Sequence, residues 1–208
     1  MQNKILITGG TGRLAAELKK HLVGDYVGKE QMDFTLPIVK GDYDIILHMG
    51  GYTDTLKAET ETDKCFQENI YGTFNLVQTY KDTPFIYIST EYCENPLGVY
   101  ALTKKIGEEI VKTHPRHLIL RTSFKPNPFP FPYAYDDQYT QGDYVDVVAK
   151  LLAEIVKTWD KKSDFKYLGT GRKTLFELAK RTRPDVLPNK VDDYNKQIGI
   201  NLIPKDYE

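Results

Sequence analysis

The sequence predicts an α/β fold with a doubly wound parallel sheet, and three features of the chain indicate it. Short apolar runs of strand length alternate with longer segments that have helical periodicity. A turn that contains Gly9 and Gly12 separates the first apolar run from the first helical segment. The chain has 208 residues, which is enough for one domain with a substantial core. Strands that alternate with helices are typical of a parallel sheet covered by helices on both faces.

Four apolar runs are predicted to be buried strands, and they cover residues 4–8, 43–49, 84–90 and 117–123. Helical spacing predicts helices over residues 13–23, 61–80, 98–112 and 144–159. In the second of these helices, the spacing places Phe66, Ile70, Phe74 and Val77 on one buried face.

The composition limits the possible partners and the domain organisation. Residues 1–208 are expected to form a single domain, to which the stretch from about 124 to 208 adds a small lobe. The formal net charge is −1, so neither a nucleic-acid footprint nor a charged membrane patch is predicted. The apolar runs are too short to span a membrane, and the N-terminus lacks the apolar core of a signal peptide. Cys65 and Cys93 lack metal-binding spacing, so we expect reduced thiols, no metal site and a cytoplasmic location.

The glycine turn is the first candidate binding site. A strand, a turn with Gly9 and Gly12, and a helix that begins at Arg13 form the arrangement that binds a dinucleotide pyrophosphate. Glycines allow the backbone to approach the phosphates closely, and Ala15 allows the helix to pack tightly on the sheet. We therefore expect Gly9, Gly12, Arg13 and Leu14 to contact a nicotinamide cofactor in a Rossmann-type domain.

Several motifs in sequence order resemble the extended short-chain dehydrogenase/reductase superfamily. After TGGTGRLA (8–15), the matching stretches are MDF (32–34), HMGGYTD (48–54), ENIYGTFNL (68–76), YISTEYC (87–93) and YALTK (100–104). The resemblance implies that Asp33 and Phe34, which follow a strand in the superfamily, contact the adenine. It also implies that Met49, Gly50 and Gly51 line the ribose and nicotinamide side.

The same resemblance implies a catalytic triad of Thr90, Tyr100 and Lys104. Tyr100 and Lys104 are four residues apart on a predicted helix, so their side chains share one face. A neighbouring ammonium is expected to lower the pKa of the tyrosine and make it a usable acid–base group. Thr90 ends a predicted strand and would bind the substrate oxygen. Lys104 would also hold the cofactor ribose.

The stretch STEYC (89–93) is similar to the STDYVF of dTDP-4-dehydrorhamnose reductases, rather than to the STDEV of dehydratases. The resemblance implies an NAD(P)-dependent reductase of a keto group on a sugar or sugar nucleotide. Compared with these reductases, the chain is short between Arg121 and Asp137, which predicts a reduced substrate lobe. Two alternatives stay open: a sugar-nucleotide epimerase with Glu91 and Cys93 as an extra acid–base pair, or a non-catalytic NAD(P)-binding regulatory subunit.

The preference between NADP and NAD depends on the residues after DYV (25–27), which is predicted to be a short strand. Lys29, together with Arg13, would favour the 2′-phosphate of NADP, whereas Glu30 would favour the ribose diol of NAD. We expect NADP by a small margin. The proline-rich stretch at 124–135 is predicted to be either a stiff connector or a wall of the site. The sequence leaves a homodimer open.

Overall fold

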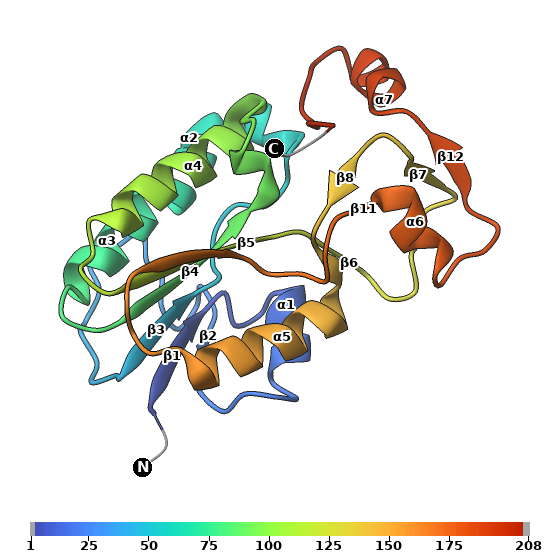
Figure 1. Ribbon diagram of the computed structural model, residues 1–208. Coiled ribbons are helices and arrows are strands. Elements are labelled where there is room, and N and C mark those ends of the chain that lie inside the picture. The colour runs from blue at the N-terminus through green and yellow to red at the C-terminus, as the bar shows by residue number, and fades with distance from the viewer. Residues whose placement is uncertain (1–2, 206–208) are drawn as a thin grey trace.

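The computed structural model describes residues 3–205, and its centre is a parallel sheet of six strands (Figure 1). The strand order across the sheet is β10-β5-β4-β3-β1-β2, and every neighbouring pair is parallel. The strands are β1 (Ile5–Thr8), β2 (Asp25–Val27), β3 (Ile45–His48), β4 (Phe85–Thr90), β5 (His117–Thr122) and β10 (Asp164–Tyr167). The predicted doubly wound fold is therefore confirmed.

Helices cover both faces of the sheet (Figure 1). One face carries α1 (Arg13–Leu18) and α5 (Val145–Thr158). The other carries α4 (Gly98–Lys112) and one continuous helical segment, which consists of α2 (Thr62–Phe66), η2 (Gln67–Tyr71) and α3 (Gly72–Thr79). None of the helices in the described part of the chain is both long and apolar enough to cross a membrane.

Strand alternation divides the core into two clusters. In β1, Ile5 and Ile7 pack toward α1 and α5, while Leu6 packs toward α3 and α4. The same alternation holds in β5, where Leu118 and Ile119 belong to opposite clusters. Because successive side chains of a strand point to opposite faces, a strand covered on both sides is apolar throughout. This explains the uninterrupted apolar runs of the sequence.

A small lobe lies beyond the carboxyl ends of the strands (Figure 1). It is built from three short two-stranded pairs and two helices: β6 (Phe124–Lys125) with β9 (Asp143–Tyr144), β7 (Tyr133–Tyr135) with β12 (Leu187–Asn189), β8 (Tyr139–Thr140) with β11 (Lys173–Thr174), α6 (Leu175–Lys180) and α7 (Val191–Ile198). Not all of the described residues from about 124 onward lie in this lobe. After β9, the chain returns to the main sheet as α5 and β10 before it re-enters the lobe at β11.

The helical segment from Thr62 to Thr79 differs from its prediction. Phe74 is 47% exposed, whereas Cys65, Asn69 and Leu76 are buried. The π-helical turn of η2 inserts an extra residue into the helical repeat, so the buried face no longer follows a constant spacing. The predicted face through Phe66, Ile70 and Phe74 is therefore wrong.

Two other segments also differ from expectation. The helix predicted over 13–23 ends at Leu18, and residues 28–44 contain no strand before or after Asp33. The proline-rich stretch lines the cleft only at its start. Its first two residues form β6 beside the main cleft, whereas Phe129 is buried in the core of the lobe.

Candidate active site

A cleft of about 480 Å³ lies at the carboxyl ends of β1, β3, β4 and β5. It is bounded by the glycine turn, the turn after β3, the start of α4 and the first residues of β6. The side chains and backbone that line it include Gly9, Gly12, Arg13, Leu14, Met49, Gly50, Gly51, Thr90, Tyr100, Lys104 and Lys125. Open α/β sheets bind their ligands at this edge, where loops from several strands converge.

The glycine turn brings two loops into close contact. Gly9 has a positive φ of 72°, and a Cβ atom there would lie 2.8 Å from the backbone nitrogen of Gly50. Gly12 is different, because a Cβ atom at this position would meet only the carbonyl oxygen of Gly9, at 3.2 Å. The open space beside Gly12 belongs to the cleft. A bare backbone at Gly12 therefore leaves a cradle that fits the phosphates of a dinucleotide, and a side chain would fill it.

His48 holds the turn after β3 in place. Its ring nitrogens lie 2.7 Å from the hydroxyl of Thr8 and 3.2 Å from the hydroxyl of Thr73. The Thr8 hydroxyl also accepts a hydrogen bond from the Gly50 backbone, at 3.3 Å. Burial holds the pKa of His48 well below its ordinary value, with a smaller contribution from the charge of Lys104. The neutral ring is thus a structural link between β1, β3 and α3.

Asn69 connects the turn after β3 with α4. Its amide accepts from the Tyr52 backbone at 2.9 Å and donates to the Tyr52 carbonyl at 3.2 Å. It also donates to the hydroxyl of Thr103, at 3.0 Å, one residue before Lys104. The buried side chain therefore fixes the Gly51–Tyr52 turn relative to α4.

A smaller hollow of about 140 Å³ continues from the cleft beyond Gly9 and Gly50. Lys29, Asp33, Phe34 and Glu68 line it. The Lys29 ammonium lies 3.7 Å from Asp33 and 3.4 Å from Glu68, so it has two carboxylate neighbours. Hydrogen bonding from the Thr35 hydroxyl lowers the pKa of Asp33, and burial acts in the opposite direction. Asp33 therefore lies in a hollow next to the glycine turn, although no strand ends directly before it.

The predicted catalytic residues meet in the cleft. Thr90 ends β4, and Tyr100 and Lys104 lie on α4. Burial raises the pKa of Tyr100 well above its ordinary value, and hydrogen bonding with Thr90 opposes this shift only in part. The prediction that Lys104 lowers the pKa of Tyr100 is therefore wrong, because the net pKa lies above its ordinary value. The Lys104 ammonium instead donates to the carbonyl of Ile88, at 2.8 Å, and burial lowers its pKa to about 8.

Glu91 and Cys93 follow Thr90 but do not line the cleft. Glu91 is 0% exposed, and its carboxylate accepts from the Thr140 hydroxyl and from the backbone of Gln141 and Gly142, at 2.7 to 3.0 Å. Cys93 is 1% exposed, and burial raises its pKa to about 11. Neither side chain is therefore placed to act as an acid–base pair in the cleft, whereas an epimerase that works by transient oxidation would use the predicted triad alone.

A buried ion pair supports the site from behind. The Glu108 carboxylate on α4 accepts two hydrogen bonds of 2.7 Å from Arg121 on β5. It also accepts from the hydroxyl of Ser89, at 2.6 Å, which lies next to Thr90 on β4. Arg121 makes a further ion pair with Glu94. Charged hydrogen bonds thereby join β4 and β5 to α4.

The structure adds lining residues to which the sequence assigned no role, although Thr53 and Tyr92 lie within the matching stretches 48–54 and 87–93. They are Thr53 and Thr55 after the Gly51 turn, Tyr92 after Thr90, and Ser123 and Lys125 after β5. Tyr92 packs edge-on against Tyr100, with ring centroids 6.4 Å apart. The only sequence signal for Ser123 and Lys125 was their place directly after a strand that ends at this edge.

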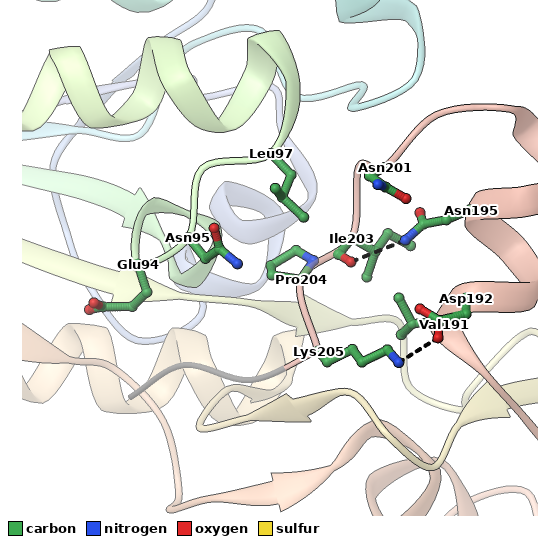
Figure 2. A pocket seen from close by; sticks show the side chains of 10 residues that line it. All are labelled: Glu94, Asn95, Leu97, Val191, Asp192, Asn195, Asn201, Ile203, Pro204 and Lys205. Carbon is green, nitrogen blue, oxygen red and sulfur yellow. Dashed lines mark hydrogen bonds and ion pairs between the residues drawn. The ribbon is translucent and has the colours of Figure 1, made fainter.

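A second hollow, of about 550 Å³, lies between the loop at 94–97 and the C-terminal part of the lobe (Figure 2). Asn95 approaches it from one side, and Asn195 and Lys205 from the other. Lys205 forms a 2.6 Å ion pair with Asp192, and Asn195 donates to the carbonyl of Ile203 (Figure 2). None of the predicted site residues lines this hollow. Within residues 3–205, no three His, Cys, Asp or Glu side chains gather as a metal site requires.

Known structures share this architecture over most of the chain. A dTDP-4-dehydrorhamnose reductase from Clostridium acetobutylicum superposes with a TM-score of 0.79 at 20% identity, over 92% of this chain and 85% of that one. The dTDP-4-dehydrorhamnose reductase from Bacillus anthracis, solved in complex with NADP, gives 0.79 at 22% identity, over 99% and 89%. RMD from Pseudomonas aeruginosa, complexed with NADPH, gives 0.69 at 16% identity, over 91% and 86%.

At these identities, the superpositions establish the fold alone. No curated protein sequence matches the chain significantly. The sequence profile of one family, however, matches residues 3–125, which contain the glycine turn, β4 and the whole of α4. The chain therefore belongs to the family described as the RmlD substrate binding domain.

Proposed function

We propose that the protein is an NAD(P)-dependent reductase of a keto group on a sugar or sugar nucleotide. One observation carries the proposal: Thr90, Tyr100 and Lys104 line the same cleft as the glycine turn. Family membership supports it, as do the printed names of structural neighbours, which are dTDP-4-dehydrorhamnose reductases, one of them in complex with NADP.

The residues of the cleft fit a nicotinamide dinucleotide. Gly9, Gly12, Arg13 and Leu14 would hold its phosphates, and Asp33 and Phe34 would hold its adenine in the smaller hollow. Met49, Gly50 and Gly51 would line the ribose and nicotinamide side. When bound in reduced form, the cofactor supplies a hydride. The open backbone at Gly12 and the separate adenine-sized hollow are the features that support this fit.

The chain's own residues would supply orientation and the proton. Thr90 would donate a hydrogen bond to the carbonyl oxygen of the substrate and so orient it. Tyr100 stays protonated at neutral pH because burial raises its pKa, so it would donate its proton to the same oxygen as negative charge develops. Lys104, held beneath it by the Ile88 carbonyl, would place a positive charge beside the cofactor ribose.

The preference for NADP over NAD stays a prediction. Lys29 is exposed enough to reach a 2′-phosphate, but its ammonium lies between Asp33 and Glu68 in the unliganded protein. NADP would therefore bind by drawing Lys29 away from these carboxylates. NAD would instead leave them free to accept from the ribose diol.

The test compares Tyr100→Phe with wild-type protein on a panel of keto sugars and keto sugar nucleotides, with NADPH oxidation followed optically. Loss of the proton donor should lower kcat by about 10² to 10⁴, because general acid catalysis contributes this much. The Kd for NADPH should change little, since the ring remains. Tyr71→Phe is the matched control, because Tyr71 is 54% exposed and lies outside the cleft.

Equal turnover by Tyr100→Phe would refute the assigned role of Tyr100. A wild-type protein that binds NADPH tightly but reduces no substrate of the panel would instead support the regulatory alternative.

A further inference from the structure

The cleft has a strongly one-sided charge. Three cations line it, Arg13, Lys104 and Lys125, and none of its described lining residues is an aspartate or glutamate. Lys104 already donates to the Ile88 carbonyl. Across residues 3–205, by contrast, the side chains of Arg13 and Lys125 have neither a hydrogen bond nor an ion pair. Two cations without partners thus face a cavity that contains no carboxylate.

The backbone of Lys125 has a defined position at the edge of the cleft. Its backbone belongs to β6, which pairs with β9 so that Lys125 lies opposite Tyr144. The side chain is half-buried, and burial lowers its pKa, with attraction from Glu91 and repulsion from Arg13 as smaller effects. Glu91 forms no ion pair with Lys125, and its carboxylate instead accepts three hydrogen bonds from the turn at 140–142.

An unpaired, partly buried cation reduces the stability of the folded protein. A ligand that supplies negative charge would remove this cost. Arg13 follows directly after Gly12, the open position of the phosphate cradle, and the charge of Arg13 is felt at Lys125. Both cations line the same cleft as the glycine turn, so one anionic group bound there could contact both.

We propose that Lys125 and Arg13 form a cationic pair that binds a diphosphate group in the cleft. This inference rests on the proposed function, which offers two sources of that group. One is the diphosphate of the nicotinamide cofactor, and the other is the diphosphate of a sugar nucleotide. The cofactor diphosphate is the expected source because Arg13 adjoins the glycine turn.

The experiment uses the full chain with Lys125→Met and measures the Kd for NADPH by fluorescence titration over a series of salt concentrations. We expect Kd to rise about tenfold or more, because a hydrogen bond to a charged group is lost. The salt dependence of Kd should also become weaker. Lys150→Met is the control, because Lys150 is an exposed lysine on α5 away from the cleft.

Thermal unfolding without ligand separates binding from folding. Lys125→Met should unfold at the same temperature as the wild type or higher, because it removes an unpaired cation. Lys125→Arg should retain the affinity for NADPH. A loss of stability in Lys125→Met that matches its loss of binding would overturn the proposal.

A second titration identifies the source, with dTDP added to protein saturated with NADPH. An affinity for dTDP that falls in Lys125→Met, with the Kd for NADPH unchanged, would assign the pair to the sugar nucleotide. Unchanged affinities for both ligands would overturn the proposal. A third outcome is that inorganic diphosphate binds in a Lys125-dependent manner while NADPH does not bind to the wild type. This result would support the diphosphate site at Arg13 and Lys125 and refute the proposed reductase function. Absence of binding by all three ligands would refute both.

Discussion

Replacing Glu108 with glutamine should destabilise the protein strongly without altering its shape. The carboxylate is 1% exposed and accepts hydrogen bonds from Arg121 and Ser89 at 2.6 to 2.7 Å. Glutamine has nearly the same volume, but it is neutral and presents a single acceptor oxygen. Arg121 would keep its ion pair with Glu94 and lose its principal buried partner.

The expected magnitude follows from the burial of the pair. Breaking a buried ion pair by removing one partner costs about 3 to 5 kcal/mol, because an uncompensated charge is left behind. Arg121 retains Glu94, so we expect the lower value, ~3 kcal/mol. For a chain of this size, 1 kcal/mol corresponds to about 2 to 4 °C, so Tm should fall by about 6 to 12 °C.

The effect should depend on pH in a defined direction. Burial raises the pKa of Glu108, but hydrogen bonds from Arg121 and Ser89 outweigh it, and the net pKa lies below the ordinary 4.5. The charged carboxylate therefore stabilises the fold above pH 4.5, and this contribution is lost as pH falls through the folded-state pKa. The difference between wild type and Glu108→Gln should be constant near neutral pH and shrink in acid.

Urea denaturation followed through the single tryptophan and by circular dichroism measures this difference. Glu109→Gln is the matched control, because Glu109 is the neighbouring, exposed glutamate of the same helix. The control should stay within about 0.5 kcal/mol of the wild type. If Glu108→Gln unfolds at the same urea concentration as Glu109→Gln, the ion pair does not stabilise the site as argued here.

Two further predictions concern cofactor binding. Gly12→Val should leave Tm nearly unchanged, because a Cβ atom there meets only the Gly9 carbonyl. It should weaken NADPH binding by at least about tenfold in fluorescence titrations. Undiminished affinity would show that the cofactor phosphates do not bind beside Gly12. Lys29→Ala should raise the Kd for NADPH several-fold and leave the Kd for NADH unchanged, and equal effects on both cofactors would contradict a contact with the 2′-phosphate.

The sequence could predict that the candidate site residues come together, because the fold class determines which ends of the strands lie side by side. Once 4–8, 43–49 and 84–90 are recognised as parallel strands, the residues that follow them must meet at one edge of the sheet. The glycine turn, the Gly50 turn and Thr90 meet there in the structure. The spacing of Tyr100 and Lys104 on one helix then places both beside Thr90.

The predictions that failed depend on the three-dimensional packing of the chain, which the spacing of residues along the sequence does not determine. The π-helical turn at 67–71 changes the buried face of its helix, and its signal is not an apolar repeat. The direction of the Tyr100 pKa shift depends on burial, which outweighs the hydrogen bond with Thr90. The environment of Lys125 depends on the pairing of β6 with β9, across the lobe, and on a Glu91 carboxylate occupied from 50 residues away.

The three hydrogen bonds that Glu91 accepts from the turn at 140–142 constrain how this fold can be engineered toward a new substrate. The acceptor, Glu91, follows directly after β4, whereas its three donors belong to the turn at 140–142 of the lobe. A lobe grafted from another protein would leave the buried Glu91 carboxylate without hydrogen-bond donors, unless its own turn presented an equivalent hydroxyl and two backbone N–H groups. Chimeras should therefore exchange Glu91 and this turn as a single unit, or place their crossovers so that both stay native.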